Sequence, residues 1–159
     1  MPRFSRSPGG VRVELDEDEA GLLRRLVEEM VSLLEANAGP ADPVVDRLFP
    51  AAYGGAEPEA EQDFRRYAGS ELERLKLEGA RRTASDLGET GPASLTLDED
   101  AASGWLALLT DLRLAIGTRL GVDEEKMARD LDPRDPEAPA LGVLHWLGWV
   151  QEEILHHLA

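Results

Sequence analysis

Near its C-terminus the chain carries a stripe of residues with the helical spacing that a metal site or a general base requires. The stripe consists of His145 and, 4, 7 and 11 residues later, Trp149, Glu152 and His156, spacings that return to one face of a helix. Two metal ligands on one helix lie four residues apart. Only Glu152/His156 and Glu153/His157 combine a carboxylate with a histidine at that spacing, and no third ligand is evident. The simpler interpretation is histidines at a helix C-terminus, where the helix dipole and a nearby carboxylate favour a cation. We therefore predict neither a metal ion nor a cofactor at this position.

A second group of charged side chains lies in the segment TDLRLAIGTRLGV, residues 110–122. Asp111, Arg113 and Arg119 could form a buried polar network, or an ion pair that holds neighbouring elements together. No serine, histidine or cysteine nucleophile accompanies them. A structural role is therefore favoured over a catalytic one.

Clusters of charged residues suggest two further kinds of site, a nucleic-acid surface and a cation site. Six basic residues fall between residues 65 and 82, interleaved with glutamates, and this pattern favours a solvated helix face with i,i+4 ion pairs over a nucleic-acid surface. The acidic runs at 16–19 and 98–100 lack the twelve-residue calcium loop, so stabilisation of a helix N-terminus explains them better. No phosphate loop, dinucleotide fingerprint, nucleophile elbow or zinc spacing is present.

Helices must position these residues, because apolar side chains recur at helical spacing over most of the chain. The periodicity predicts a mainly α fold, a single-domain bundle of about five to six helices. The expected helices follow an acidic cap at residue 16 and end before residue 39, then cover residues 44–49, 59–87, 98–120, 123–128 and 139–158. Within 59–87 a glycine and a serine at 69–70 leave open a helix pair or one kinked helix. The last helix is apolar nearly all round between residues 141 and 150, which is typical of a central buried element.

Two short segments have the alternating pattern of strands. Residues 11–15 and 94–97 alternate apolar and polar side chains, and each is followed by an acidic N-cap and an apolar helix. A lone short strand is not stable, so we expect the two to pair into a small two-stranded β ribbon. Residues 1–10 are expected to be a flexible N-terminal tail before one helical domain at 11–159.

The composition excludes several classes of function. With 17 basic and 32 acidic residues the formal net charge is -15, which repels phosphate backbones and anionic lipids. The absence of cysteine excludes disulfides, thiolate metal sites and cysteine nucleophiles. The N-terminus does not read as a secretory signal, and no apolar run reaches the roughly 20 residues that a membrane span needs. A cytoplasmic protein without direct nucleic-acid or membrane contact is expected.

Three segments carry a family resemblance. They are DPVVDRLFPAAY at 42–53, TDLRLAIGTRLGV at 110–122 and HWLGWVQEEIL at 145–155, and they resemble an actinobacterial domain-of-unknown-function family that includes the oxidative-stress regulator AosR. The resemblance implies a protein that acts through protein contacts on transcription under oxidative stress, with a sigma factor, RNA polymerase or a protease-adaptor system as partner. It also implies a CxxxC pair near the N-terminus that forms a regulatory disulfide. The corresponding residues here, FSRSPGG at 4–10, contain no cysteine, so that switch does not transfer.

No family catalytic residue is available to carry over, so the matching residues are candidates for structure or partner contact. With the polar residues above, the candidates are Asp111, Arg113, Arg119, His145, Trp146, Trp149 and Gln151. We expect a non-enzymatic regulatory or adaptor protein without a cysteine redox switch. One alternative is an enzyme or ligand-binding protein that uses carboxylates and histidines, which a pocket converging on Asp111, Arg113 and His145 would favour. The other is a structural homo-oligomer, such as a homodimer, which a large exposed apolar patch would favour.

Overall fold

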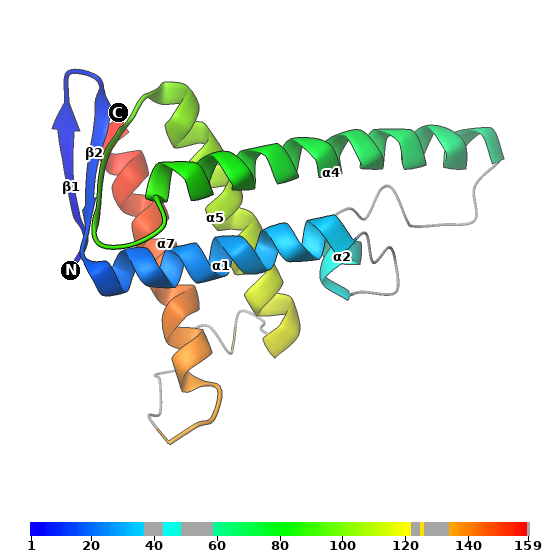
Figure 1. The fold of residues 1–159 in the computed structure, drawn as a ribbon. Coiled ribbons are helices and arrows are strands. Elements are labelled where there is room, and N and C mark those ends of the chain that lie inside the picture. The colour runs from blue at the N-terminus through cyan, green and yellow to red at the C-terminus, as the bar shows by residue number, and fades with distance from the viewer. Residues whose placement is uncertain (37–42, 49–58, 122–124, 126–133, 159) are drawn as a thin grey trace.

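In the part of the chain that the structure describes, four long helices, one short helix and a small sheet form the fold (Figure 1). The computed structural model describes residues 1–36, 43–48, 59–121, 125 and 134–158, and of residues 45, 46 and 59–70 only the backbone. In chain order the elements are strands β1 (Arg3–Ser7) and β2 (Gly10–Leu15), helices α1 (Glu17–Ala36), α2 (Pro43–Leu48) and α4 (Glu59–Leu87), strand β3 (Ala93–Leu97), and helices α5 (Glu99–Leu120) and α7 (Ala138–Leu158). The mainly helical fold predicted from the sequence is confirmed.

Acidic N-caps begin helices α1 and α5, as the sequence predicts. At α1 the backbone N–H of Asp16 donates to Glu19 Oε1 and the backbone N–H of Glu19 donates to Asp16 Oδ1, both at 2.8 Å, which is a reciprocal capping box. At α5 the Asp98 carboxylate accepts a hydrogen bond of 2.7 Å from the backbone N–H of Ala101. Because each cap directly follows a strand, it sets the direction in which the helix leaves the sheet.

Helix α4 is one continuous helix of 29 residues. The break at Gly69-Ser70, which the sequence left open, does not occur. At roughly 1.5 Å per residue the helix is about 43 Å long. Its C-terminal half packs along α1, where Arg81 forms an ion pair with Glu35, whereas its N-terminal half extends beyond the other helices (Figure 1).

The basic cluster predicted within residues 65–82 forms surface ion pairs in its described part. Arg74 donates hydrogen bonds of 2.6 Å to Glu78 and 3.0 Å to Glu71, which are i,i+4 and i,i+3 neighbours on the helix. The hydrogen bond to Glu71 and the charge of its carboxylate raise the pKa of the Arg74 guanidinium. The prediction of a solvated, ion-paired face is confirmed for these residues but is wrong for Lys76, which points inward as described below.

The sheet contains the predicted ribbon. Strands β2 and β3 pair antiparallel, from Val11 opposite Leu97 to Leu15 opposite Ala93, as expected for residues 11–15 and 94–97. Because side chains alternate across a strand, one face of β2 buries Val11, Val13 and Leu15 while the other faces solvent.

A third strand corrects the expected ribbon and the expected tail. Strand β1, which lies within residues 1–10, pairs antiparallel with β2 from Arg3 opposite Glu14 to Ser7 opposite Gly10, and the order is β1-β2-β3. Phe4 is the only apolar residue of the strand, so the alternation that identifies a half-buried strand is missing. The proline and two glycines at residues 8–10, which are typical of a turn, were the feature of the sequence that could have indicated a strand before β2.

The core lies between the inner face of the sheet and helices α1, α5 and α7. Its largest fully buried side chains are Trp105, Leu23, Leu97, Leu147, Ile154, Val11, Val13, Val27, Val44 and Val150. In the described part of the chain, Thr83 and Asp111 are the only buried polar residues. Helix α5 therefore carries a charged side chain where the surroundings are mostly apolar.

The described residues contain four long helices of 20 to 29 residues, which does not match the predicted five to six. The further helix α2 is short, with six residues. The expected helix at 123–128 lies outside the described residues except for Glu125. The last helix, α7, is not buried all round: its buried residues are Leu141, Leu144, Leu147, Val150 and Ile154, which lie on one face, and His145 is exposed.

Candidate functional site

Asp111 on α5 is held by Lys76 on α4. Both carboxylate oxygens of Asp111 lie 2.8 Å from Lys76 Nζ, and the two side chains are 12% and 21% exposed. A charge in a largely apolar setting is costly unless an opposite charge accompanies it. The pair therefore ties the middle of α4 to the middle of α5.

A second polar network joins α5 to α7 through Gln151. Arg113 Nη1 donates to Gln151 Oε1 at 2.9 Å, and Gln151 Nε2 donates to Thr110 Oγ1 at 2.8 Å and to the Leu106 carbonyl at 3.2 Å. The amide of Gln151 thus uses both its acceptor and its donors on α5. Arg113 Nε is buried and has no hydrogen-bond partner among the described residues.

The guanidinium of Arg113 packs on a glycine of α7. A Cβ atom added at Gly148 would lie 3.3 Å from Arg113 Cζ and 3.5 Å from Arg113 Nε. At that separation the guanidinium would have to move by a few tenths of an ångström. Gly148 therefore leaves the space in which the Arg113 side chain crosses from α5 to α7.

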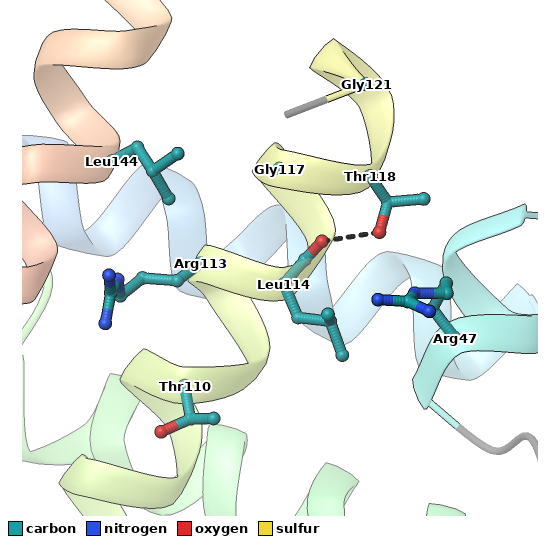
Figure 2. Close-up of a pocket in the computed structure, with 8 residues that line it drawn as sticks. All are labelled: Arg47, Thr110, Arg113, Leu114, Gly117, Thr118, Gly121 and Leu144. Carbon is teal, nitrogen blue, oxygen red and sulfur yellow. Dashed lines mark hydrogen bonds between the residues drawn. The ribbon is translucent and has the colours of Figure 1, made fainter. Parts of the chain in front are cut away.

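A pocket of about 440 Å³ lies on the outer face of α5, between α2 and α7 (Figure 2). Its described lining consists of Arg47 from α2, Thr110, Arg113, Leu114, Gly117 and Thr118 from α5, Gly121 at the C-cap of α5, and Leu144 from α7. In Figure 2 the Leu114 side chain lies between the two arginines, with Arg113 on the α7 side and Arg47 reaching in from α2. The volume is within the range of roughly 300–1,000 Å³ that ligand sites occupy.

The charged residues Asp111, Arg113 and Arg119 do not form one network. Asp111 pairs with Lys76 and Arg113 with Gln151, on two different neighbours of α5. Arg119 is exposed and lines two pockets between α1 and α5, of about 50 Å³ and 550 Å³. Within the described residues, the pocket that includes Arg113 does not include Asp111 or His145, so the convergence that would favour an enzyme is not found there.

The histidines of α7 lie at or near the surface. His145 and His156 are exposed, while His157 is half-buried, with Nδ1 2.8 Å from the Glu153 carbonyl oxygen and 3.7 Å from its carboxylate. This arrangement fits a histidine in the last helical turn beside an acidic residue. In the part of the chain that the structure describes, no three histidine, aspartate or glutamate side chains gather as metal ligands would.

The tryptophans of α7 are half-buried. Trp149 packs edge-on against Phe4 of β1, with ring centroids 5.7 Å apart and planes at 76°, and Trp146 packs against the core cluster. Phe4 also stacks on His157 at 6.4 Å. Trp149 thus connects the last helix with the first strand, and whether either tryptophan contacts a partner stays a prediction.

Two residues, one in the ion pair with Asp111 and one in the pocket lining, were missed by reasoning from the sequence. Lys76 was assigned to the solvated face of α4, and nothing in its local pattern distinguishes it from the exposed basic residues nearby. Arg47 lies in the short segment DPVVDRLFPAAY, which was noted for its resemblance and not for its charge. Both residues are 35 or more positions from their neighbours on α5, since 111 minus 76 is 35 and 113 minus 47 is 66.

None of the described helices is long and apolar enough to cross a membrane.

No solved structure matches the chain at a significant level. The chain is 28% identical over 185 aligned residues to the "Oxidative stress regulator AosR" of Mycobacterium tuberculosis (strain ATCC 25618 / H37Rv), and to the protein of the same name from Mycobacterium bovis (strain ATCC BAA-935 / AF2122/97); each alignment covers 97% of this chain and 81% of the relative. The family described as "Domain of unknown function (DUF2017)" matches residues 1–158, and this chain therefore belongs to the DUF2017 family.

Proposed function

We propose that this chain is a non-enzymatic regulatory or adaptor protein that acts through protein–protein contacts in a transcriptional stress response. The observation that carries the proposal is its alignment, over 97% of the chain, with proteins named as oxidative stress regulators. Its partner is a sigma factor, RNA polymerase or a component of a protease-adaptor system, and it works in the cytoplasm.

The charge of the protein supports a basic partner. A formal net charge of -15 attracts positively charged protein surfaces, such as the DNA-binding regions of transcription proteins, and speeds their association.

The two polar networks support a structural role for the residues that carry them. Asp111 and Gln151 direct their hydrogen bonds to neighbouring helices, which stabilises the surfaces that a partner would meet.

Regulation in this protein works without a thiol. The chain has no cysteine, so peroxide cannot form a disulfide in it. Contact with the partner is therefore constitutive or controlled by something other than cysteine chemistry.

The experiment that tests the proposal is affinity capture of the tagged chain from its native cytoplasm, with and without peroxide, followed by quantitative mass spectrometry. We expect one sigma factor, RNA polymerase subunit or protease-adaptor component at near-stoichiometric yield, and equal yield in both conditions. Recovery of the chain alone in both conditions would contradict the proposal. Light scattering of the purified protein separates this result from the homo-oligomer alternative.

Two exposed leucines allow the contact to be located. Leu75 on α4 is 54% exposed and Leu155 on α7 is 55% exposed, so Leu75→Glu and Leu155→Glu make the same change at equal exposure on different helices. Each substitution adds a charge to an apolar surface without affecting the core. Loss of the captured partner in one variant only assigns the contact to that helix.

A further inference from the structure

The pocket between α2, α5 and α7 combines two arginines with an apolar centre. Thr110, Leu114, Gly117 and Thr118 recur on α5 at intervals that keep them on one face, and this face, with the C-cap residue Gly121, forms the floor. Arg47 and Arg113 border the floor on opposite sides, while Leu144 of α7 lies above Arg113 (Figure 2). The floor is open because glycines at two of these positions carry no side chain.

Neither arginine has a carboxylate partner among the described residues. Arg113 bonds to the neutral amide of Gln151, and its Nε atom is buried without a hydrogen-bond partner in the described part of the chain. The described ion pairs of the protein include neither Arg47 nor Arg113. Arg113 is half-buried, and a half-buried guanidinium without a counter-ion is unfavourable; an anionic ligand would offset this cost.

The two threonines in the pocket do not offer donors to a ligand. Thr118 Oγ1 donates to the Leu114 carbonyl at 2.7 Å and Thr110 Oγ1 donates to the Leu106 carbonyl at 2.9 Å, so both hydroxyl protons are already used within α5. The backbone N–H of Gly121 likewise bonds to the carbonyls of Gly117 and Thr118. Recognition of an acidic group therefore falls to the two guanidinium groups, which bind carboxylates and phosphates through paired hydrogen bonds.

We propose that this pocket binds a small organic anion whose acidic groups pair with Arg47 and Arg113 and whose apolar body lies on Leu114 and Leu144. The acidic groups are carboxylates or phosphates, since the guanidinium geometry accepts both. A bare inorganic ion would leave the leucines uncovered, and a neutral apolar molecule would leave the arginines without a counter-ion. This inference is independent of the regulatory function proposed above.

The test is calorimetric titration of the full chain with suberate, an eight-carbon dicarboxylate, beside octanoate, octyl phosphate and the neutral 1,8-octanediol. We expect saturable one-to-one binding of suberate, weaker binding of the two probes with a single acidic group, and no measurable binding of the diol. Nitrogen-15 amide shifts at suberate saturation should be largest from Thr110 to Gly121 and around Leu144.

Single substitutions separate the two charges. Arg47→Gln and Arg113→Gln should each weaken suberate binding by about tenfold or more, whereas Arg82→Gln, an exposed arginine of α4 outside the pocket lining, should leave it unchanged. Arg47 is exposed, so its variant is expected to fold even where loss of the Arg113–Gln151 bond perturbs α7. The proposal is overturned by absence of saturable binding with all three anionic probes, by equal affinity for the diol, by wild-type affinity in Arg47→Gln, or by amide shifts that map outside the pocket.

Discussion

Lys76 and Asp111 face each other across two long helices, with Lys76 Nζ 2.8 Å from both oxygens of the Asp111 carboxylate. The two side chains lie 35 residues apart in sequence. They bring the only buried carboxylate of the described residues against the element that extends furthest from the bundle. The pair therefore links α4 directly to α5.

Loss of the lysine should destabilise the protein more than loss of a surface cation. Lys76→Met leaves the Asp111 carboxylate without the cation that binds both its oxygens, and we expect about 2–3 kcal/mol less unfolding free energy, below the roughly 3–5 kcal/mol of a fully buried pair. Urea unfolding measures the difference. Arg74→Met on the same helix, whose ion pairs are exposed, is the matched control and should unfold close to the wild type. The double variant Lys76→Met/Asp111→Leu should recover most of the loss, and failure to recover it would show that the pair itself is not the cause.

Gln151 should contribute more than its position near the surface suggests. Gln151→Ala removes three hydrogen bonds, to Arg113, Thr110 and the Leu106 carbonyl. The expected loss is about 1–3 kcal/mol of unfolding free energy, measured by chemical denaturation. The neighbouring Glu152 is exposed, and Glu152→Ala should have little effect. Similar stabilities for the two variants would contradict a role for Gln151 in joining α5 to α7.

A glycine series on the long helices tests the packing of the Arg113 side chain. At Gly142 and Gly104 an added Cβ would meet no atom within 4 Å, so alanine should raise stability by about 0.5–1 kcal/mol through helix propensity. At Gly148 the same methyl would lie 3.3 Å from Arg113 Cζ. Gly148→Ala should therefore gain less than the other two or lose stability, as thermal unfolding would show. An equal gain at all three positions would mean that Arg113 moves aside without cost.

The turn between β1 and β2 should tolerate no side chain at Gly10. Its φ is 137°, and an added Cβ would lie 1.9 Å from the Leu97 carbonyl oxygen. Gly10→Ala is expected to lower the unfolding free energy by about 2–4 kcal/mol, from backbone strain and overlap together. Gly88 also has a positive φ, of 74°, but open space around it, so Gly88→Ala should cost only the strain, about 1–2 kcal/mol. Equal losses in the two variants would rule out the overlap with β3.

Local patterns predicted the parts of the fold that local physics decides. The acidic residues at 16 and 98 are N-caps because their carboxylates reach backbone N–H groups three residues ahead. The pairing of β2 with β3 was predicted because the sequence contains two short strand patterns and a single short strand is not stable without a partner. Strand β1 was not predicted from the sequence because its stability comes from long-range contacts. Its backbone pairs with β2, and its one apolar side chain, Phe4, packs on Trp149 of α7.

The candidate site was predicted on α5 and α7 and missed on α2 and α4. Asp111, Arg113 and Gln151 were singled out on α5 and α7, but their partners are set by how the helices pack. A lysine on a charged helix looks the same whether it faces water or a carboxylate on another helix, and only the packing of α4 on α5 decides which. The same holds for Arg47, whose relation to α5 comes from the docking of α2.

The order of the elements in space has a consequence for biosynthesis. Strand β2 is synthesised before β3 and α7. Val11 and Val13 have no exposed surface in the folded protein, but they are covered only once β3 and then α7, which packs against both β1 and β2, have been made. The closing contact of Phe4 with Trp149 joins residues 145 positions apart, 149 minus 4. Contacts of such long sequence separation form late and slowly, so a nascent chain exposes an apolar strand until its last helix is made. Any protein that shields this strand during translation would have to leave when α7 arrives.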